Sequence, residues 1–233
     1  MLWKKVDRTG QENGKTILHS LCAKKDCSFL GLILNAEGVN ASARNERGAT
    51  PLHYAAGSNH SDAIKILLDA RADPDILNDY SKNRRGKTPL HRAATAGCME
   101  ACQALLDSGI DVSQENGAGL TALHFAAFNS RPKCVERFLK AGADAMFEDS
   151  TGATALHYAS SAKVCHLLIE AGADVNHLNK YGATPLHMAC CWDLSIVEIL
   201  LHAGADIMAV DNDAMTHSRR FANYSWTRAP GLL

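Results

Sequence analysis

Apolar residues recur along this chain in short runs with helical spacing, and turn-forming or polar residues follow each run. The runs 63–68 and 196–201 place isoleucine and leucine on one face of a helix and turn a charged residue, Lys65 or Glu198, to the other. Shorter stretches with paired alanines, at 55–56, 93–94 and 126–127, precede such runs and allow helices to pack closely. The pattern predicts pairs of short helices joined by turns and extended loops.

One motif marks the start of each pair. The pattern Thr-x-Leu-His occurs six times, at intervals of 34, 38, 33, 33 and 30 residues, and a glycine stands two residues before each threonine. Glycine tolerates the positive φ of a tight turn, and threonine is a good residue to cap the N-terminus of a helix. A period of this length predicts a solenoid, because one unit cannot bury its apolar face without its neighbours.

The units resemble those of the ankyrin repeat family. The family signatures stand here as Thr184-Pro185-Leu186-His187 and Gly172-Ala173-Asp174-Val175-Asn176. The resemblance covers residues 13–210 and implies an all-α solenoid of stacked helix-turn-helix units with projecting hairpin-like loops. The implied repeats are 13–44, 45–77, 83–115, 116–148, 149–178 and 179–210. Residues 1–12 form an N-terminal segment, 78–82 a loop insertion, and 211–233 a partial capping repeat and tail.

Several positions depart from the repeat. The insertion leads into a basic stretch that contains Arg84, Arg85 and Lys87, which is either a contact for an acidic partner, a solvated loop or a nuclear-import signal. Repeat five is about three residues short, and we expect a tight loop between its helices at 160–163. Arg71 stands where other units have a helix-ending glycine, so we expect a different turn there.

The first repeat is apolar on almost every side between Phe29 and Leu34. Solenoid ends face water and need polar outer surfaces or a cover. We expect Leu2, Trp3 and Val6 to cover this segment, and the alternative is another repeat, domain or subunit.

Composition excludes several classes of protein. The formal net charge of -1 gives no overall field that would draw the chain to nucleic acid or to an anionic membrane. No apolar stretch approaches the about 20 residues that cross a bilayer. The eight cysteines do not repeat as pairs, which favours a reducing compartment. We expect a cytoplasmic or nuclear protein, monomeric and without a cofactor.

Eleven histidines raise the question of a metal or acid–base site. Six of them belong to the motif, and in the family this imidazole bridges its own threonine and a neighbouring loop. Successive copies should lie about 10 Å apart, whereas metal–ligand bonds are about 2 Å long. The other histidines form no spaced ligand set, and Cys191 has no flanking base to activate it. We therefore predict that the chain is not an enzyme.

The resemblance implies binding through the loop tips and the exposed ends of the first helices. Carried over by position, the basic contacts are Arg47, Arg84, Arg85 and Lys87, and the aromatic contacts are Phe128, Tyr181 and Trp192. Together they suggest a protein partner with an acidic segment and an apolar one. Alternatively, Trp192 fills space beside a short loop.

The segment 168–176 is similar to sequences that asparaginyl hydroxylases modify in ankyrin proteins, which makes Asn176 a candidate, although it also fits the plain consensus repeat. The function that follows is a non-enzymatic scaffold or adaptor. The alternatives are a regulatory ankyrin segment of a channel, kinase or ubiquitin-ligase adaptor, and a factor like a proteasome-assembly chaperone.

Overall fold

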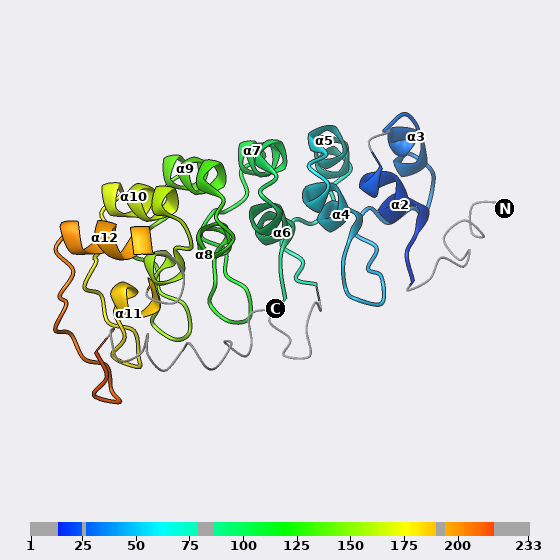
Figure 1. Cartoon of the computed structure of the whole chain (residues 1–233). Coiled ribbons are helices and arrows are strands. Elements are labelled where there is room, and N and C mark those ends of the chain that lie inside the picture. The colour runs from blue at the N-terminus through cyan, green and yellow to red at the C-terminus, as the bar shows by residue number, and fades with distance from the viewer. Residues whose placement is uncertain (1–13, 25–26, 79–85, 190–193, 217–233) are drawn as a thin grey trace. The chain divides into compact units, whose positions relative to one another are not determined.

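The computed structural model describes residues 14–24, 27–78, 86–189 and 194–216, which form short helices joined by turns and loops (Figure 1). The chain divides into two compact units, residues 1–122 and 123–233, and each is described by itself. In these ranges the one strand-like pairing is an isolated bridge between Val210 and Thr216. The all-α fold class is therefore confirmed.

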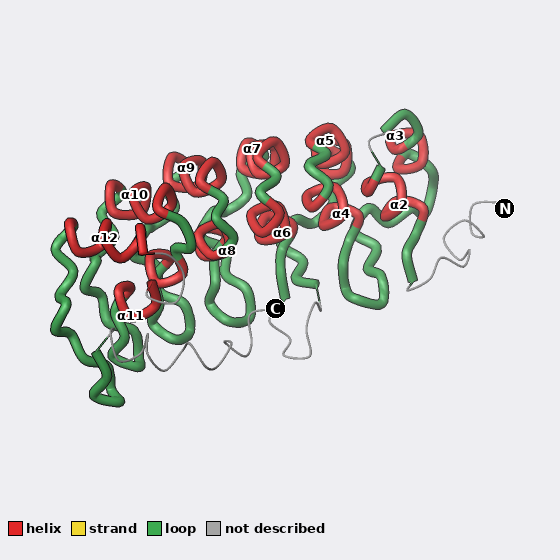
Figure 2. Tube along the Cα trace, in the orientation of Figure 1, coloured by secondary structure: helices red, strands yellow, loops and turns green. Residues whose placement is uncertain are grey.

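The first unit contains three helix pairs. They are α2 (Ile17–Ala23) with α3 (Leu30–Leu34), α4 (Pro51–Gly57) with α5 (Ser61–Asp69), and α6 (Pro89–Ala96) with α7 (Met99–Asp107). The first helices α2, α4 and α6 pack in sequence order, and so do the second helices α3, α5 and α7. This gives two helical layers, with the loops projecting on the side of the first helices (Figure 2).

The second unit repeats the arrangement with one shortened member. Its elements are α8 (Ala122–Phe128), α9 (Pro132–Lys140), the 3₁₀ helix η1 (Ala155–Tyr158), α10 (Ala162–Glu170), α11 (Pro185–Ala189) and α12 (Leu194–His202). The second helices α9, α10 and α12 pack in order, and η1 packs against α11.

Threonine and histidine of the motif start the first helices together. The Thr88 backbone N–H donates to Nδ1 of His91 at 3.1 Å, and the His91 N–H donates to Oγ1 of Thr88 at 3.4 Å. Both groups would otherwise lack a partner in the first turn of α6. The same contact to Nδ1, at 3.0 to 3.1 Å, comes from the backbone of Thr16, Thr50, Thr154 and Thr184.

The other nitrogen of each motif histidine reaches the following repeat. Nε2 lies between 2.7 and 3.3 Å from the carbonyl oxygen of the residue that precedes the next threonine position. The six pairs are His19–Ala49, His53–Lys87, His91–Leu120, His124–Ala153, His157–Ala183 and His187–Met215. The bridging role that the family resemblance implied for these histidines is therefore observed.

The apolar positions of the repeat form a continuous core within each unit. The motif leucines are buried, and alanines such as Ala55 and Ala93 are completely inaccessible to solvent. Larger side chains from the second helices, Leu67 and Leu105 in the first unit and Phe138 in the second, fill the space between helix layers. Alanine on the first helices lets neighbouring repeats approach closely enough for the histidine bridges to form.

Two expectations about turns are wrong. Arg71 has φ 59° and closes α5 with the same turn as the glycines: its N–H reaches the Leu68 carbonyl, as Gly142 reaches Leu139. The different turn expected there is absent. In repeat five, α10 already begins at Ala162, so the missing residues come from the first helix, which is reduced to one 3₁₀ turn.

Asn78 is part of the regular hairpin and not of an insertion. It accepts the Lys87 N–H at its side chain and donates its own N–H to the Lys87 carbonyl, at 2.9 and 3.1 Å. The extra residues therefore lie between this closing pair. The covering residues expected for the first repeat, Leu2, Trp3 and Val6, lie outside the described ranges, and Phe29 and Leu32 are 60% and 68% exposed.

Replacing Arg71 by glycine should stabilise the protein. A side chain in the left-handed region costs on the order of 1 kcal/mol, and glycine removes that strain while making the unfolded chain more flexible. We expect the free energy of unfolding in urea to rise by about 0.5 kcal/mol.

The matched control is Gly109→Ala in the next repeat. Gly109 has φ +80°, and a Cβ at this position would meet open space, so only backbone strain opposes the alanine. This variant should lose about 1 kcal/mol. If Arg71→Gly instead lowers the free energy of unfolding, contacts of the arginine side chain stabilise the fold by more than the left-handed backbone strain destabilises it.

Candidate functional site

The projecting loops are hairpins that a single asparagine or aspartate side chain closes at the base. Oδ1 of Asn45 accepts the N–H groups of Arg47 and Ala49 at 2.9 and 3.0 Å. Asn116, Asp149, Asn179 and Asp211 make the same pair of contacts two and four residues ahead. Each of these hairpin turns is thus closed by one side chain.

This closing residue is the functional position that sequence reasoning missed. The signal was present, because asparagine or aspartate stands three residues before the turn glycine at Gly48, Gly119, Gly152 and Gly182. In the last hairpin Ala214 replaces the glycine and adopts φ 54°, yet Asp211 closes the turn in the same way. The degenerate seventh unit therefore keeps its hairpin as far as Thr216.

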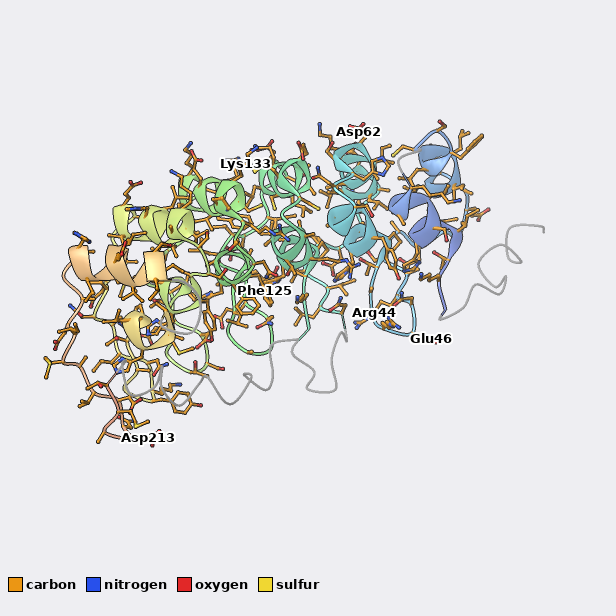
Figure 3. The ribbon with its side chains drawn as sticks, in the orientation of Figure 1. Arg44, Glu46, Asp62, Phe125, Lys133 and Asp213 are labelled. Carbon is orange, nitrogen blue, oxygen red and sulfur yellow. The ribbon has the colours of Figure 1, made fainter. Side chains whose placement is uncertain are left out.

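The exposed basic residue Arg47 lies at a hairpin tip of the first unit. Its neighbour Glu46 is also exposed, and Figure 3 shows Glu46 and Arg44 on this hairpin, far from Asp62 on α5. Arg44 donates from Nη2 to the Leu77 carbonyl at 3.1 Å, which links two successive hairpins. Arg47 is thus placed where an approaching chain can reach it.

Lys87 lies at the base of the third hairpin and is half-buried. Its Nζ donates to Oγ1 of Thr95 on α6 at 3.2 Å. Burial lowers the pKa of Lys87, and the nearby Arg92 charge lowers it further. The predicted contacts Arg84 and Arg85 lie outside the described residues.

A row of cationic and aromatic side chains runs along the first helices of this unit. Tyr54 on α4 packs edge-on against His19, with 5.3 Å between ring centroids. Lys15 and Arg92 lie over the Tyr54 ring, 5.3 and 5.6 Å from its centroid. Cations at this distance are attracted by the electrons of the ring face.

In the second unit, the positions equivalent to those of the first carry side chains with different charges and hydrogen bonds. Tyr158 occupies the position of Tyr54 and donates its hydroxyl to Oδ2 of Asp149 at 2.6 Å. Burial raises the pKa of Asp149, but hydrogen bonds from Thr151 and Tyr158 outweigh it and leave that pKa below its usual value. Two hairpins of this unit close on aspartate, whereas Asn45, Asn78 and Asn116 close those of the first.

The three predicted aromatic contacts have different surroundings. Tyr181, at a hairpin tip, is 60% exposed. Phe128 is half-buried at the end of α8, and its carbonyl accepts the Ser160 hydroxyl at 2.7 Å. Trp192 lies outside the described residues. Tyr181 is therefore available to a partner, and the roles of Phe128 and Trp192 stay predictions.

Several of the described histidines and cysteines are buried and serve the fold. No group of three or more potential metal ligands occurs among the described residues. Burial lowers the pKa of His53 and His157 to about 4, so both imidazoles are neutral near pH 7. Burial also raises the pKa of the Cys22 thiol to about 12 and that of Cys165 to about 11, which keeps them protonated and unreactive. Cys191 lies outside the described residues.

Asn176 lies on the exposed loop after α10. Its side chain donates to the Gly204 carbonyl at 3.0 Å and accepts the Asp206 N–H at 2.8 Å. It thus ties the loops of two successive repeats together. Among the described residues no helix is long and apolar enough to cross a membrane.

Comparison with known proteins agrees with this geometry. The profile for ankyrin repeats in three copies matches residues 1–78, 18–116, 73–149 and 123–211. The chain belongs to the ankyrin repeat family. Its repeats are therefore those of a protein-interaction fold that is generally non-enzymatic.

Two particular proteins resemble this ankyrin chain. The crystal structure of the ankyrin repeat domain of Bcl-3, described as a unique member of the IkappaB protein family, is 27% identical with a TM-score of 0.74. The likeness covers 92% of this chain and 100% of that one. Cortactin-binding protein 2 of Ornithorhynchus anatinus is 35% identical over 60 residues, which is 26% of this chain and 4% of that protein.

Proposed function

We propose that this ankyrin chain is a scaffold or adaptor that binds one protein partner through its hairpin tips and first helices. The observation that carries the proposal is the row of cationic and aromatic side chains along the first helices of the first unit, where Lys15 and Arg92 lie over the Tyr54 ring. Histidine, threonine and the closing asparagines satisfy the buried polar groups of the repeats. Arg47 and Tyr181 remain exposed at tips that those groups hold in place.

The partner that fits this surface carries an acidic segment and an apolar one. Arg47, Lys87, Arg84 and Arg85 supply positive charge from the first unit, and arginine matches carboxylates with two parallel hydrogen bonds. Tyr181, with Phe128 and Trp192 by position in the repeat, supplies aromatic contacts from the second unit. We place the protein in the cytoplasm or nucleus and treat it as a monomer.

Site-specific photo-crosslinking tests the binding surface. p-Benzoylphenylalanine at Arg47 or at Tyr181 should crosslink a common protein in a lysate of the native cells, because both positions are exposed hairpin tips. The same group at Lys65 on α5 or at Lys133 on α9 is the control, since both are exposed on second helices. Equal crosslinking from Lys65 and Lys133 would place the binding surface elsewhere.

A second readout concerns charge. Arg47→Glu combined with Arg84→Glu and Arg85→Glu should weaken recovery of that crosslinked protein about tenfold or more, because three attractive contacts become repulsive. Lys65→Glu changes charge on the opposite layer and should have little effect. Unchanged recovery with the triple variant would remove the acidic segment from the proposal.

We also propose Asn176 as a site of asparagine hydroxylation, on the sequence resemblance given above. Because its side chain is exposed but hydrogen-bonded to two residues of the next repeat, the loop must open before an enzyme can reach it. After co-expression with an asparaginyl hydroxylase, mass spectrometry should find one added oxygen on the peptide that contains Asn176. Asn40 follows a second helix in the first repeat and serves as an internal comparison. An unmodified Asn176 peptide would end this proposal.

A further inference from the structure

Arg92 is a half-buried charge whose partner is missing from the described chain. Its Nε is buried and has no hydrogen-bond partner, and within the described ranges its guanidinium makes no ion pair. Burial of a charge without a partner is costly, so such groups are normally paired in folded proteins. A ligand that supplies a negative charge would offset this cost.

The surrounding residues hold the Arg92 side chain in place. The guanidinium lies over the Tyr54 ring on one side. On the other side it crosses the end of α4 at Gly57, where a Cβ would come within 2.6 Å of Nε. Glycine at position 57 therefore creates the space that Arg92 occupies, and the side chain is positioned before any ligand arrives. A positioned side chain loses less conformational entropy on binding.

Other cations next to Arg92 add to its positive field. Lys15 lies over the same Tyr54 ring, and the Arg92 charge also disfavours the protonated forms of Lys87 and His53. The groups whose charges shift His53 are Arg92, Arg44 and His19, and none of them is a carboxylate. The hairpin before α4 carries one acidic residue, Glu46, which is exposed at the tip (Figure 3). Like charges gathered around a half-buried arginine raise the free energy of the unbound protein.

We propose that Arg92, together with Lys15 and Lys87 around Tyr54, binds carboxylate side chains of an acidic peptide segment laid across the first helices α2, α4 and α6. The proposal rests on the scaffold function, and it assigns the contact with the partner's acidic segment to this Arg92 centre. An extended segment places alternate side chains about 7 Å apart on one side. Lys15 Nζ and Arg92 Cζ lie 5.3 and 5.6 Å from the Tyr54 centroid, so acidic side chains of one extended segment can reach both cations.

The probe is a fluorescein-labelled peptide of six Glu-Ser repeats, and a peptide of six Gln-Ser repeats is the uncharged control. At low ionic strength the intact chain should bind the Glu-Ser peptide and not the Gln-Ser peptide, as measured by fluorescence anisotropy. Arg92→Gln should weaken the Glu-Ser complex about tenfold, since it removes a charged hydrogen-bonding partner. Glu46→Gln should strengthen it, because a competing carboxylate is lost.

Lys65→Gln is the matched control, with the same change in net charge on an exposed position of α5. Lys15→Gln is a second variant outside α6, and it should weaken binding about threefold. Circular dichroism and thermal unfolding should show that Arg92→Gln is at least as stable as the parent, because an unpaired charge has been removed.

The proposal is wrong if the intact chain does not bind the Glu-Ser peptide, or if Arg92→Gln and Lys65→Gln weaken binding equally. Displacement of the peptide by inorganic phosphate at equal charge concentration would also overturn it, since the centre would then bind anions in general. If hairpin crosslinks form while Arg92→Gln has no effect, the scaffold function stands and the Arg92 centre falls. If neither result is obtained, both fail.

Discussion

The imidazole of each Thr-x-Leu-His motif is buried between two repeats, and its two nitrogens have fixed and different tasks. In five of the six motifs Nδ1 accepts a backbone N–H from the threonine at the helix start, so it carries no proton. A carbonyl can only accept, so Nε2 must carry the proton that it donates to the next repeat. Loss of this ring would leave a buried carbonyl and a helix-start N–H without partners, at about 1 to 3 kcal/mol for each group. Stacking of the repeats therefore depends on imidazoles that remain neutral.

This constraint separates the residues that build the repeat from those that are free to bind. Threonine, histidine, leucine and the closing asparagine or aspartate are buried and recur in nearly every unit. The hairpin tips and the outward positions of the first helices are less constrained, and they differ between the units. The first unit gathers Lys15, Arg47, Lys87 and Arg92 near neutral asparagines, whereas Asp149 and Asp211 close hairpins of the second. The exposed residues that can recognise a partner therefore differ between units, whereas the residues that build the repeat recur.

The sequence was sufficient to predict the helix pairs and the turn glycines, because each follows from residue types that recur in register, and the family resemblance implied the histidine bridges. The sequence did not predict the features that depend on how neighbouring elements pack in three dimensions. Arg71 adopts the left-handed turn because the helix end requires it, and the propensity of arginine is overridden. Repeat five shortens its first helix and not its loop, since α10 must keep its packing between α9 and α12. Arg92 had no sequence signal, because its importance comes from Gly57 and Tyr54 of the preceding repeat, which only the fold brings beside it.

The most direct test of the histidine bridges is nuclear magnetic resonance of the imidazole nitrogens across a pH titration. At pH 7 the six motif rings should be neutral with the proton on Nε2, and that proton should exchange slowly with water. His53 and His157 should remain neutral until the pH approaches about 4, because burial lowers their pKa values. In the unfolded chain the same rings take up protons near pH 6.5, so acid should favour unfolding as the pH falls from about 6.5 towards 4. Motif rings with the proton on Nδ1, or rings that titrate near pH 6.5 in the folded protein, would contradict the bridges on which the stacking rests.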